Sequence, residues 1–189
     1  TEQAELTTYI DFSSYKDSIL SNFAQGKRTN VNNGIKSGLK CRKLQNAEEV
    51  ECFYALLCEN LKKHAAAPVH SLSELRLLHE EILAGSTALL GVFSPEGRML
   101  AAGWLFLFKN QQTVHTQYLC ADSEFNALSP MTFLYYSSIE YAKQQGYRYL
   151  SWGISTEEHG RILNWGLTES KEHFGSSHGC HRSYIKQLR

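Results

Sequence analysis

The sequence predicts one α/β domain built around a mixed β-sheet. Its 189 residues, of which 42% are hydrophobic and 20% charged, suffice for the core of one ordinary domain rather than two. Residues 129–154 read as a helix, a glycine turn and a buried strand, which is half of a βαβ crossover. Residues 87–121 read as three antiparallel strands joined by short turns. Together these patterns indicate parallel and antiparallel pairing in the same sheet.

The helix expected over residues 129–146 has the clearest boundaries. Ser129 suits the N-cap, and Pro130 suits the first helical position, where its missing N–H costs nothing. Apolar and aromatic residues then recur with a period of about 3.6 and predict one buried face. Gly146 provides the left-handed stop, and residues 147–154 follow directly as a strand. Ligands bind at strand ends in such sheets, so the polar loop over residues 155–160 is an expected binding edge.

Residues 1–38 are expected to form a helical lead-in to a sheet domain over residues 39–189. The first ten residues carry little pattern, and a short amphipathic helix is expected before Gly26. A second helix is expected over residues 27–37, with Val31 and Ile35 facing inward.

The sheet domain opens with an alternating strand over residues 39–44. Two helices follow, the first ending near His64, and their starts carry the capping pairs Asn46 with Glu49 and Ser71 with Glu74. The strands of the meander are expected at 87–93, 99–108 and 113–121. A last helix over residues 163–174 and a closing strand over residues 180–188 complete the chain.

Composition excludes several classes of function. Nineteen basic and nineteen acidic side chains cancel, so no global field attracts DNA or an anionic membrane. The longest apolar run, residues 99–108, is too short to span a bilayer. Five cysteines without regular spacing indicate reduced thiols in a cytoplasmic protein. The chain starts at Thr1 without methionine, so we expect it to have been processed, tagged or cut from a longer one.

One segment departs from this neutrality. Residues 27–43 contain six basic residues and no acid. They form either a solvated helix and edge strand or a phosphate-contacting patch, for which Lys27, Arg28 and Lys36 are the candidates.

The order of elements matches the GNAT acyltransferase fold, a mixed sheet split near its middle. Several short segments, in this order and spacing, further resemble the Fem-type branch of that fold, which contains peptidoglycan-bridge aminoacyltransferases and acetyltransferase-like relatives. These segments are residues 26–31 (GKRTNV), 36–39 (KSGL), 129–130 (SP), 152–155 (WGIS), 166–167 (GL), 170–171 (SK) and 174–175 (FG). The resemblance covers residues 9–189 and concerns the second of the two GNAT-like halves that such proteins usually carry.

This resemblance implies an N-acyltransferase that moves an acetyl or aminoacyl group directly to a small-molecule or peptide amine. It implies that Lys171 stabilises the negative charge that develops on the carbonyl oxygen. The residues alone favour the other interpretation, a solvent-facing lysine between Glu169 and Glu172. An aminoacyl-tRNA donor and a second GNAT-like half are implied partners, although neutral charge disfavours extensive tRNA contact. The alternative is a non-catalytic GNAT-fold module that binds a ligand or supports the other half.

The donor segment differs from that of ordinary acyl-CoA enzymes. A glycine-rich loop usually cradles the pyrophosphate there. Residues 122–130 contain no glycine and two acids, and Pro130 removes one N–H donor. This composition disfavours the binding of CoA. Three alternatives remain open: acyl-CoA, an unusual donor, or no donor at all. The candidate donor-binding residues are Asn126, Ala127, Leu128 and Ser129.

An amine acceptor must lose a proton, so a base is required. His115 is the preferred candidate and Tyr118 the second, and alternation places them on opposite faces of their strand. The candidates for acceptor binding are Gly153, Ser155, Glu157 and His159.

No metal or hydrolytic site is expected. The histidines and the cysteine at 173–181 lack the spacing of a zinc site. Neither a nucleophile elbow nor a Walker loop is present.

Overall fold

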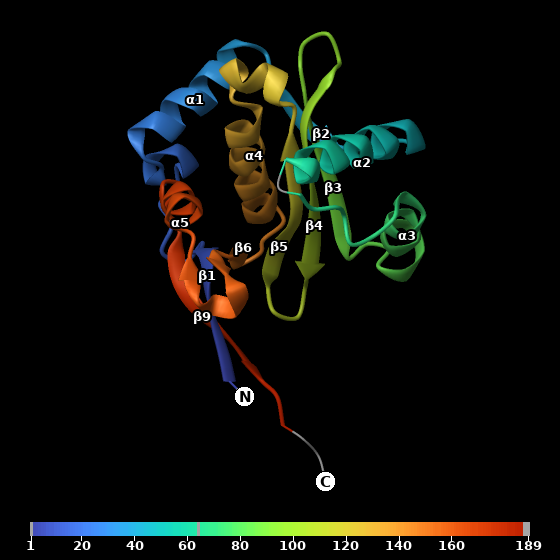
Figure 1. The fold of residues 1–189 in the computed structure, drawn as a ribbon. Helices are drawn as coiled ribbons and strands as arrows, with labels where there is room; N and C mark the ends of the chain where they lie inside the picture. Colours follow the sequence, from blue (N-terminus) through green and yellow to red (C-terminus); the bar gives the residue numbers. More distant parts are fainter. Residues whose placement is uncertain (1, 64, 187–189) are drawn as a thin grey trace.

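The computed structural model describes residues 2–63 and 65–186, which form a mixed sheet with helices on both faces (Figure 1). Within these residues the main sheet has seven strands in the order β2-β3-β4-β5-β6-β1-β9. All neighbours are antiparallel except β5 and β6, so the predicted mixed sheet is confirmed. The strands are β1 (Glu2–Asp11), β2 (Lys40–Lys43), β3 (Thr87–Phe93), β4 (Met99–Phe108), β5 (Thr113–Ala121), β6 (Tyr149–Ile154) and β9 (Ser177–Tyr184). A separate hairpin contains β7 (Thr156–Glu157) and β8 (Ile162–Leu163).

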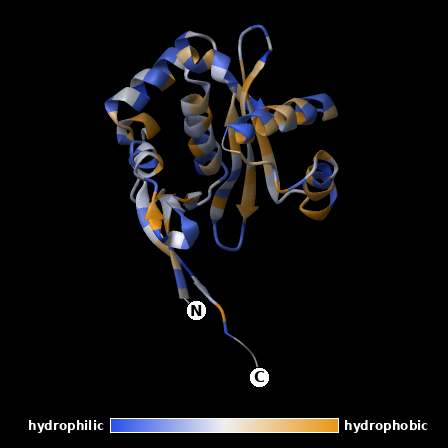
Figure 2. Ribbon diagram, viewed as in Figure 1, coloured by the Kyte–Doolittle hydropathy of each residue, from blue (hydrophilic) through white to orange (hydrophobic). Residues whose placement is uncertain are grey.

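The helices divide the protein into two cores. On one face α4 (Pro130–Gln144) packs against β3, β4 and β5, and α1 (Gln25–Lys36) packs against α4. On the other face α2 (Ala47–Lys62) and α3 (Leu72–Leu77) cover Trp104 and its neighbours. The short helix α5 (Trp165–Glu172) lies beside β1 (Figure 1). Strands β3 and β4 are hydrophobic over most of their length, as Figure 2 shows, because both of their faces are covered.

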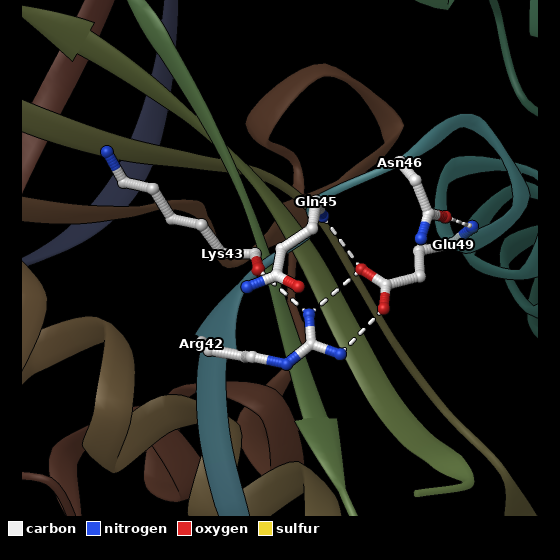
Figure 3. A network of polar contacts seen from close by, with 5 residues as sticks. All are labelled: Arg42, Lys43, Gln45, Asn46 and Glu49. Carbon is white, nitrogen blue, oxygen red and sulfur yellow. Dashed lines mark hydrogen bonds and ion pairs between the residues drawn. The ribbon is translucent and has the colours of Figure 1, made fainter.

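The edge strand β2 is joined to the start of α2 by a polar network (Figure 3). The Arg42 guanidinium donates to both carboxylate oxygens of Glu49, at 2.6 and 2.9 Å. Glu49 also accepts from the Gln45 N–H, and Asn46 caps the helix through the Glu49 N–H. The expected N-cap at Asn46 is therefore confirmed. Ser71 and Glu74 form the full capping box that the sequence predicts.

The N-terminal segment differs from expectation. Glu2–Asp11 is not patternless but pairs with β6 on one side and with β9 on the other. The amphipathic helix expected before Gly26 is only a 3₁₀ turn, Ile19–Asn22. Ile35 is 51% exposed rather than inward. Gly34 faces the core instead. A Cβ on Gly34 would lie only 2.8 Å from the Phe133 ring, so the helix can approach α4 this closely only with glycine at this position. The division at residue 38 stays a prediction.

The boundaries of the later elements need smaller corrections. Ser129 adopts a left-handed conformation (φ 53°) and makes no side-chain cap, so its expected N-cap role is wrong, whereas Pro130 is confirmed at the start of α4. Gly146 has φ 75°, as a helix stop requires. Strand β9 begins at Ser177, earlier than expected. Residues 64 and 187–188 of the expected elements lie outside the described residues.

No helix in the described ranges combines the length and the apolar composition that crossing a bilayer requires.

Candidate functional site

The parallel strands β5 and β6 separate shortly after they begin. They pair only at three positions, and the last pair is His115 with Ser151. Strand β5 also carries a bulge, since Trp104 faces Tyr118 while Leu105 faces Thr116. Gln117 is therefore the extra residue. Beyond His115, the side of β5 that faces the split has no strand partner among the described residues. At its far end the Asn60 side chain bonds the N–H and the C=O of Ala121, so the backbone groups nearer to His115 are the ones left for a ligand.

The bulge changes which side chains share a face. Val114 packs into the core beneath α4, whereas Tyr118 and Cys120 pack with Trp104 beneath α2. His115, which alternates with Val114, therefore lies on the same face as Tyr118, and the expectation of opposite faces is wrong. Tyr118 is engaged elsewhere, because its hydroxyl accepts from the Val69 N–H at 3.3 Å.

A pocket of about 690 Å³ opens at the split, and we call it the split pocket. It lies where β5, β6, β1 and β9 meet. Its lining includes His115 and Gly153, both expected at the site, and residues that the sequence analysis did not select. These are Glu5, Thr7, Thr116, Gln117, Ser151, Trp152, Ile154, Cys180 and His181.

His115 has the properties of a base in this pocket. Its Nδ1 lies 3.2 Å from Ser151 Oγ. Burial lowers the pKa of His115, and the positive charge of Lys171 lowers it further. The imidazole is therefore neutral at pH 7 and can accept a proton.

Lys171 is held inside the protein rather than exposed to solvent. It is only 3% exposed, and its ammonium donates to the carbonyl oxygens of Gly153 (3.2 Å) and Ile154 (2.8 Å) and to Ser155 Oγ (2.9 Å). Burial lowers its pKa to about 8. The three ammonium protons thus fix the end of β6, which forms one wall of the split pocket.

The other residues expected to bind the acceptor are less well placed. Ser155 is 1% exposed, does not line the split pocket and contacts Thr8 Oγ1 at 3.1 Å. Glu157 accepts from the Asn164 side chain at 2.7 Å. His159 lies in the exposed turn Glu158–Gly160 with φ 58°. Of the four expected residues, only Gly153 lines the split pocket.

The expected donor segment lies at the far end of β5. Asn126, Ala127 and Leu128 belong to the 3₁₀ turn Ser123–Leu128, and Ser129 follows it directly before α4. Four residues of extended strand, roughly 13 Å, separate Gln117 from the end of β5 at Ala121. The donor segment and the split pocket therefore lie at opposite ends of the unpaired edge.

Arg98 changes the charge of this segment. It forms ion pairs with Asp122 (2.8 Å) and Glu124 (3.5 Å) and lies over the Phe125 ring. One of the two negative charges expected to oppose a pyrophosphate is therefore compensated.

The three expected phosphate ligands do not converge. Lys27 turns to α5, where its ammonium donates to Ser170 Oγ at 3.2 Å and lies 4.8 Å from the centre of the Phe174 ring. Arg28 donates to Gln25. Lys36 lies about 14 Å from Lys27 along the axis of α1. The structure does not form one phosphate site from these residues.

Strands β1 and β9 contribute lining residues that were not among the residues predicted from the sequence. The alternation of Ala4, Leu6, Thr8 and Ile10 was the available signal for β1. Glu5 alternates with these residues and therefore lies on the other face of β1, where its Oε2 is 3.7 Å from His181 Nδ1. No group of three or more metal-ligating side chains occurs among the described residues.

Comparisons with known proteins agree with this geometry. The family model described as "Acetyltransferase (GNAT) domain" matches residues 25–161. FemX has the same fold, with a TM-score of 0.74 at 14% identity over 92% of this chain and 59% of its own. L-PGS from Bacillus licheniformis gives 0.70 at 13% identity, over 100% of this chain and 63% of its own.

A third solved structure, the C-terminal domain of a putative lysylphosphatidylglycerol synthetase from Agrobacterium fabrum, gives a TM-score of 0.66 at 12% identity over 96% of this chain and 60% of its own. The chain thus spans about three fifths of each of these structures. The predicted fold, including its likeness to the Fem type, is confirmed. No curated protein matches the sequence.

Proposed function

Because the chain belongs to the GNAT acetyltransferase family, we propose that it is an N-acyltransferase that moves an acetyl or aminoacyl group directly from an activated donor to an amine. The observation that carries this proposal is the junction of the unpaired β5 edge with a pocket that contains a neutral histidine.

The acceptor amine enters the split pocket as an ammonium ion. The carboxylate of Glu5 attracts it, and His115 removes the proton that must leave before the nitrogen can attack. Both side chains line the same pocket, so one amine can meet both. A small-molecule or peptide amine fits this role.

The donor carbonyl lies against the edge of β5 near Gln117. Backbone N–H groups freed by the bulge and by the split stabilise the negative charge that develops on its oxygen. The amine nitrogen forms the new bond to the carbonyl carbon, and the bond to the leaving sulfur or oxygen breaks. His115 releases the first proton to solvent, takes the second proton that the nitrogen loses as the amide forms, and passes it to the leaving sulfur or oxygen.

Acyl-CoA is the donor to test first, since it would supply an activated thioester. The residues present fit it in two respects. Ser129 does not cap α4, which leaves the helix N-terminus to an anion, and Arg98 compensates one of the two neighbouring acidic charges. Asn126 to Ser129 would face the pyrophosphate. Aminoacyl-tRNA is the alternative donor, and a second GNAT-like half is a possible partner of this chain.

Substitution of His115 by glutamine should lower kcat/KM for transfer about a hundredfold, because the base is lost while the side-chain volume is retained. In the wild type, activity should rise with pH to a plateau, with a midpoint below 6.5, the ordinary pKa of histidine. The assay follows release of the CoA thiol from acetyl-CoA with a panel of primary amines. Unchanged activity in His115→Gln would assign the proton transfer to another group.

Substitution of Arg98 by alanine should weaken acetyl-CoA binding about tenfold, because Asp122 and Glu124 would then repel the pyrophosphate. Calorimetric titration with acetyl-CoA measures this, and Lys109→Ala in the β4–β5 turn is the matched control. Equal affinities for the two variants would place the donor elsewhere.

One observation favours the non-catalytic module as a second candidate. All three protons of Lys171 are directed to groups of the protein itself, so the residue that the Fem-type resemblance implies as the oxyanion ligand has no proton free. Titration separates the candidates, because the enzyme must bind a donor. A chain that binds neither CoA, acetyl-CoA nor aminoacyl-tRNA, and transfers no acyl group from them, would be the module.

A further inference from the structure

A second cavity lies outside the split. It has a volume of about 870 Å³ and is formed by the edge strand β2, the turn between β3 and β4, and α4, and we call it the edge groove. It shares no lining residue with the split pocket. The proposed acyl transfer gives it no role.

The lining shows that the groove follows the edge of β2. Side chains alternate between the two faces of a strand, so a cavity on one face touches every second residue. Here all residues from Gly38 to Lys43 line the cavity. The groove therefore reaches the open edge, where β2 pairs with β3 on one side and has no second strand partner among the described residues. The Lys43 C=O on this edge accepts from the Arg42 guanidinium at 3.1 Å, so an added strand pairs with the remaining groups.

The opposite wall is one stripe of α4. Its members are spaced by four, three, one and three residues, which places them on the same side of the helix. They are Phe133, Ser137, Glu140, Tyr141 and Gln144. Residues 93–95 and Gly97 close one end. A groove between a strand edge and a helix is the geometry in which an extended peptide adds a strand to a sheet.

The charge of the groove selects its occupant. Lys40 and Lys43 are exposed at the two ends of β2, and the Lys43 ammonium lies 5.3 Å from the centre of the Tyr141 ring. Glu140 is the one acid in this lining, and it accepts a hydrogen bond from the Tyr136 hydroxyl. Lysines on an edge strand repel a second copy of the same strand and attract an acidic one.

We propose that the edge groove is a docking site for an extended acidic peptide segment of a partner protein, which pairs with β2 while alternate side chains enter the groove beside α4. A four-residue strand spans roughly 13 Å, so it pairs with a segment of about the same number of residues. In this proposal the basic residues of β2 attract the acidic peptide, whereas those of α1 take no part in the site.

The probe is a fluorescein-labelled peptide of alternating glutamate and valine, added to the full chain at low ionic strength. Fluorescence anisotropy should show saturable binding that weakens with salt. Hydrogen exchange should show new protection in residues 39–44. The peptide with lysine in place of glutamate should not bind.

Charge reversal tests the assignment. Lys43→Glu should weaken binding about tenfold, whereas Lys109→Glu, an equal charge change in the β4–β5 turn, should leave it unchanged. Both lysines are exposed, and circular dichroism checks that each variant is folded. No binding, protection of β9 instead of β2, or equal affinities of the two variants would overturn the proposal. Since acyl transfer takes place in the split pocket, Lys43→Glu should retain it, and this separates the two proposals.

Discussion

Lys171→Met is expected to lower the free energy of unfolding by about 2 kcal/mol and to reduce acyl transfer, because the lysine holds the end of β6 that forms one wall of the split pocket. The carbonyls of Gly153 and Ile154 would lose their buried donor, which typically costs about 1–3 kcal/mol for each group. Removing a desolvated charge offsets part of that cost. Urea denaturation measures the loss, and Lys109→Met, in the exposed β4–β5 turn, is the control.

The pH dependence of stability identifies the source of the effect. The pKa of Lys171 falls from 10.5 to about 8 in the folded protein, so the unfolded state binds more protons between these two values. This contribution makes the native state more stable as pH rises, by at most about 1.4 kcal/mol per pH unit. The raised pKa values of Cys41 and Cys120 act in the opposite direction above pH 9. These cysteine contributions are the same in wild type and in Lys171→Met, so they cancel when the two free energies of unfolding are subtracted. That difference should grow as the pH rises above 8. A constant difference would contradict the buried, titrating lysine.

His115 supplies a second readout of the same substitution. The charge of Lys171 contributes to the lowered pKa of His115, so removing that charge should raise the pKa toward its ordinary value. Titration of the imidazole by NMR detects this shift. An unchanged His115 pKa together with lost transfer would mean that Lys171 acts on the substrate and not through the histidine.

The environment of Lys171 also shows where sequence reasoning ends. Helix α4, the meander and the glycine stop at 146 depend on residues close in sequence, and local patterns predicted them. The ammonium of Lys171 instead meets carbonyls 17 and 18 residues away, and Ser155 meets Thr8 147 residues away. The bulge at Gln117 is a property of how two strands pair, so alternation alone placed Tyr118 on the wrong face. His115 could be selected because its chemistry is intrinsic, whereas its neighbours Glu5 and Ser151 required the sheet order.

Gly160→Ala is expected to destabilise the protein by about 4 kcal/mol, the upper range for a single substitution. Gly160 has φ 86°, a conformation that costs an alanine about 1–2 kcal/mol. A Cβ there would also overlap the backbone carbonyl of Ala4, and because the obstructing atoms belong to the backbone, no side-chain rotation relieves the overlap. The turn would have to leave β1.

That movement would reach the site through the chain that follows β6. The Ser155 N–H donates to the Leu6 carbonyl at 2.8 Å, and Ser155 Oγ accepts from Lys171. Displacement of the turn from β1 strains both contacts, so transfer should fall together with stability. Gly97→Ala separates the two causes of destabilisation, since Gly97 has the same φ of 86° but no atom within 4 Å of its Cβ position. It should lose only the 1–2 kcal/mol of the backbone conformation. Equal losses in the two variants, measured by urea denaturation, would mean that the turn is free to move away from β1 and does not hold the wall of the split pocket.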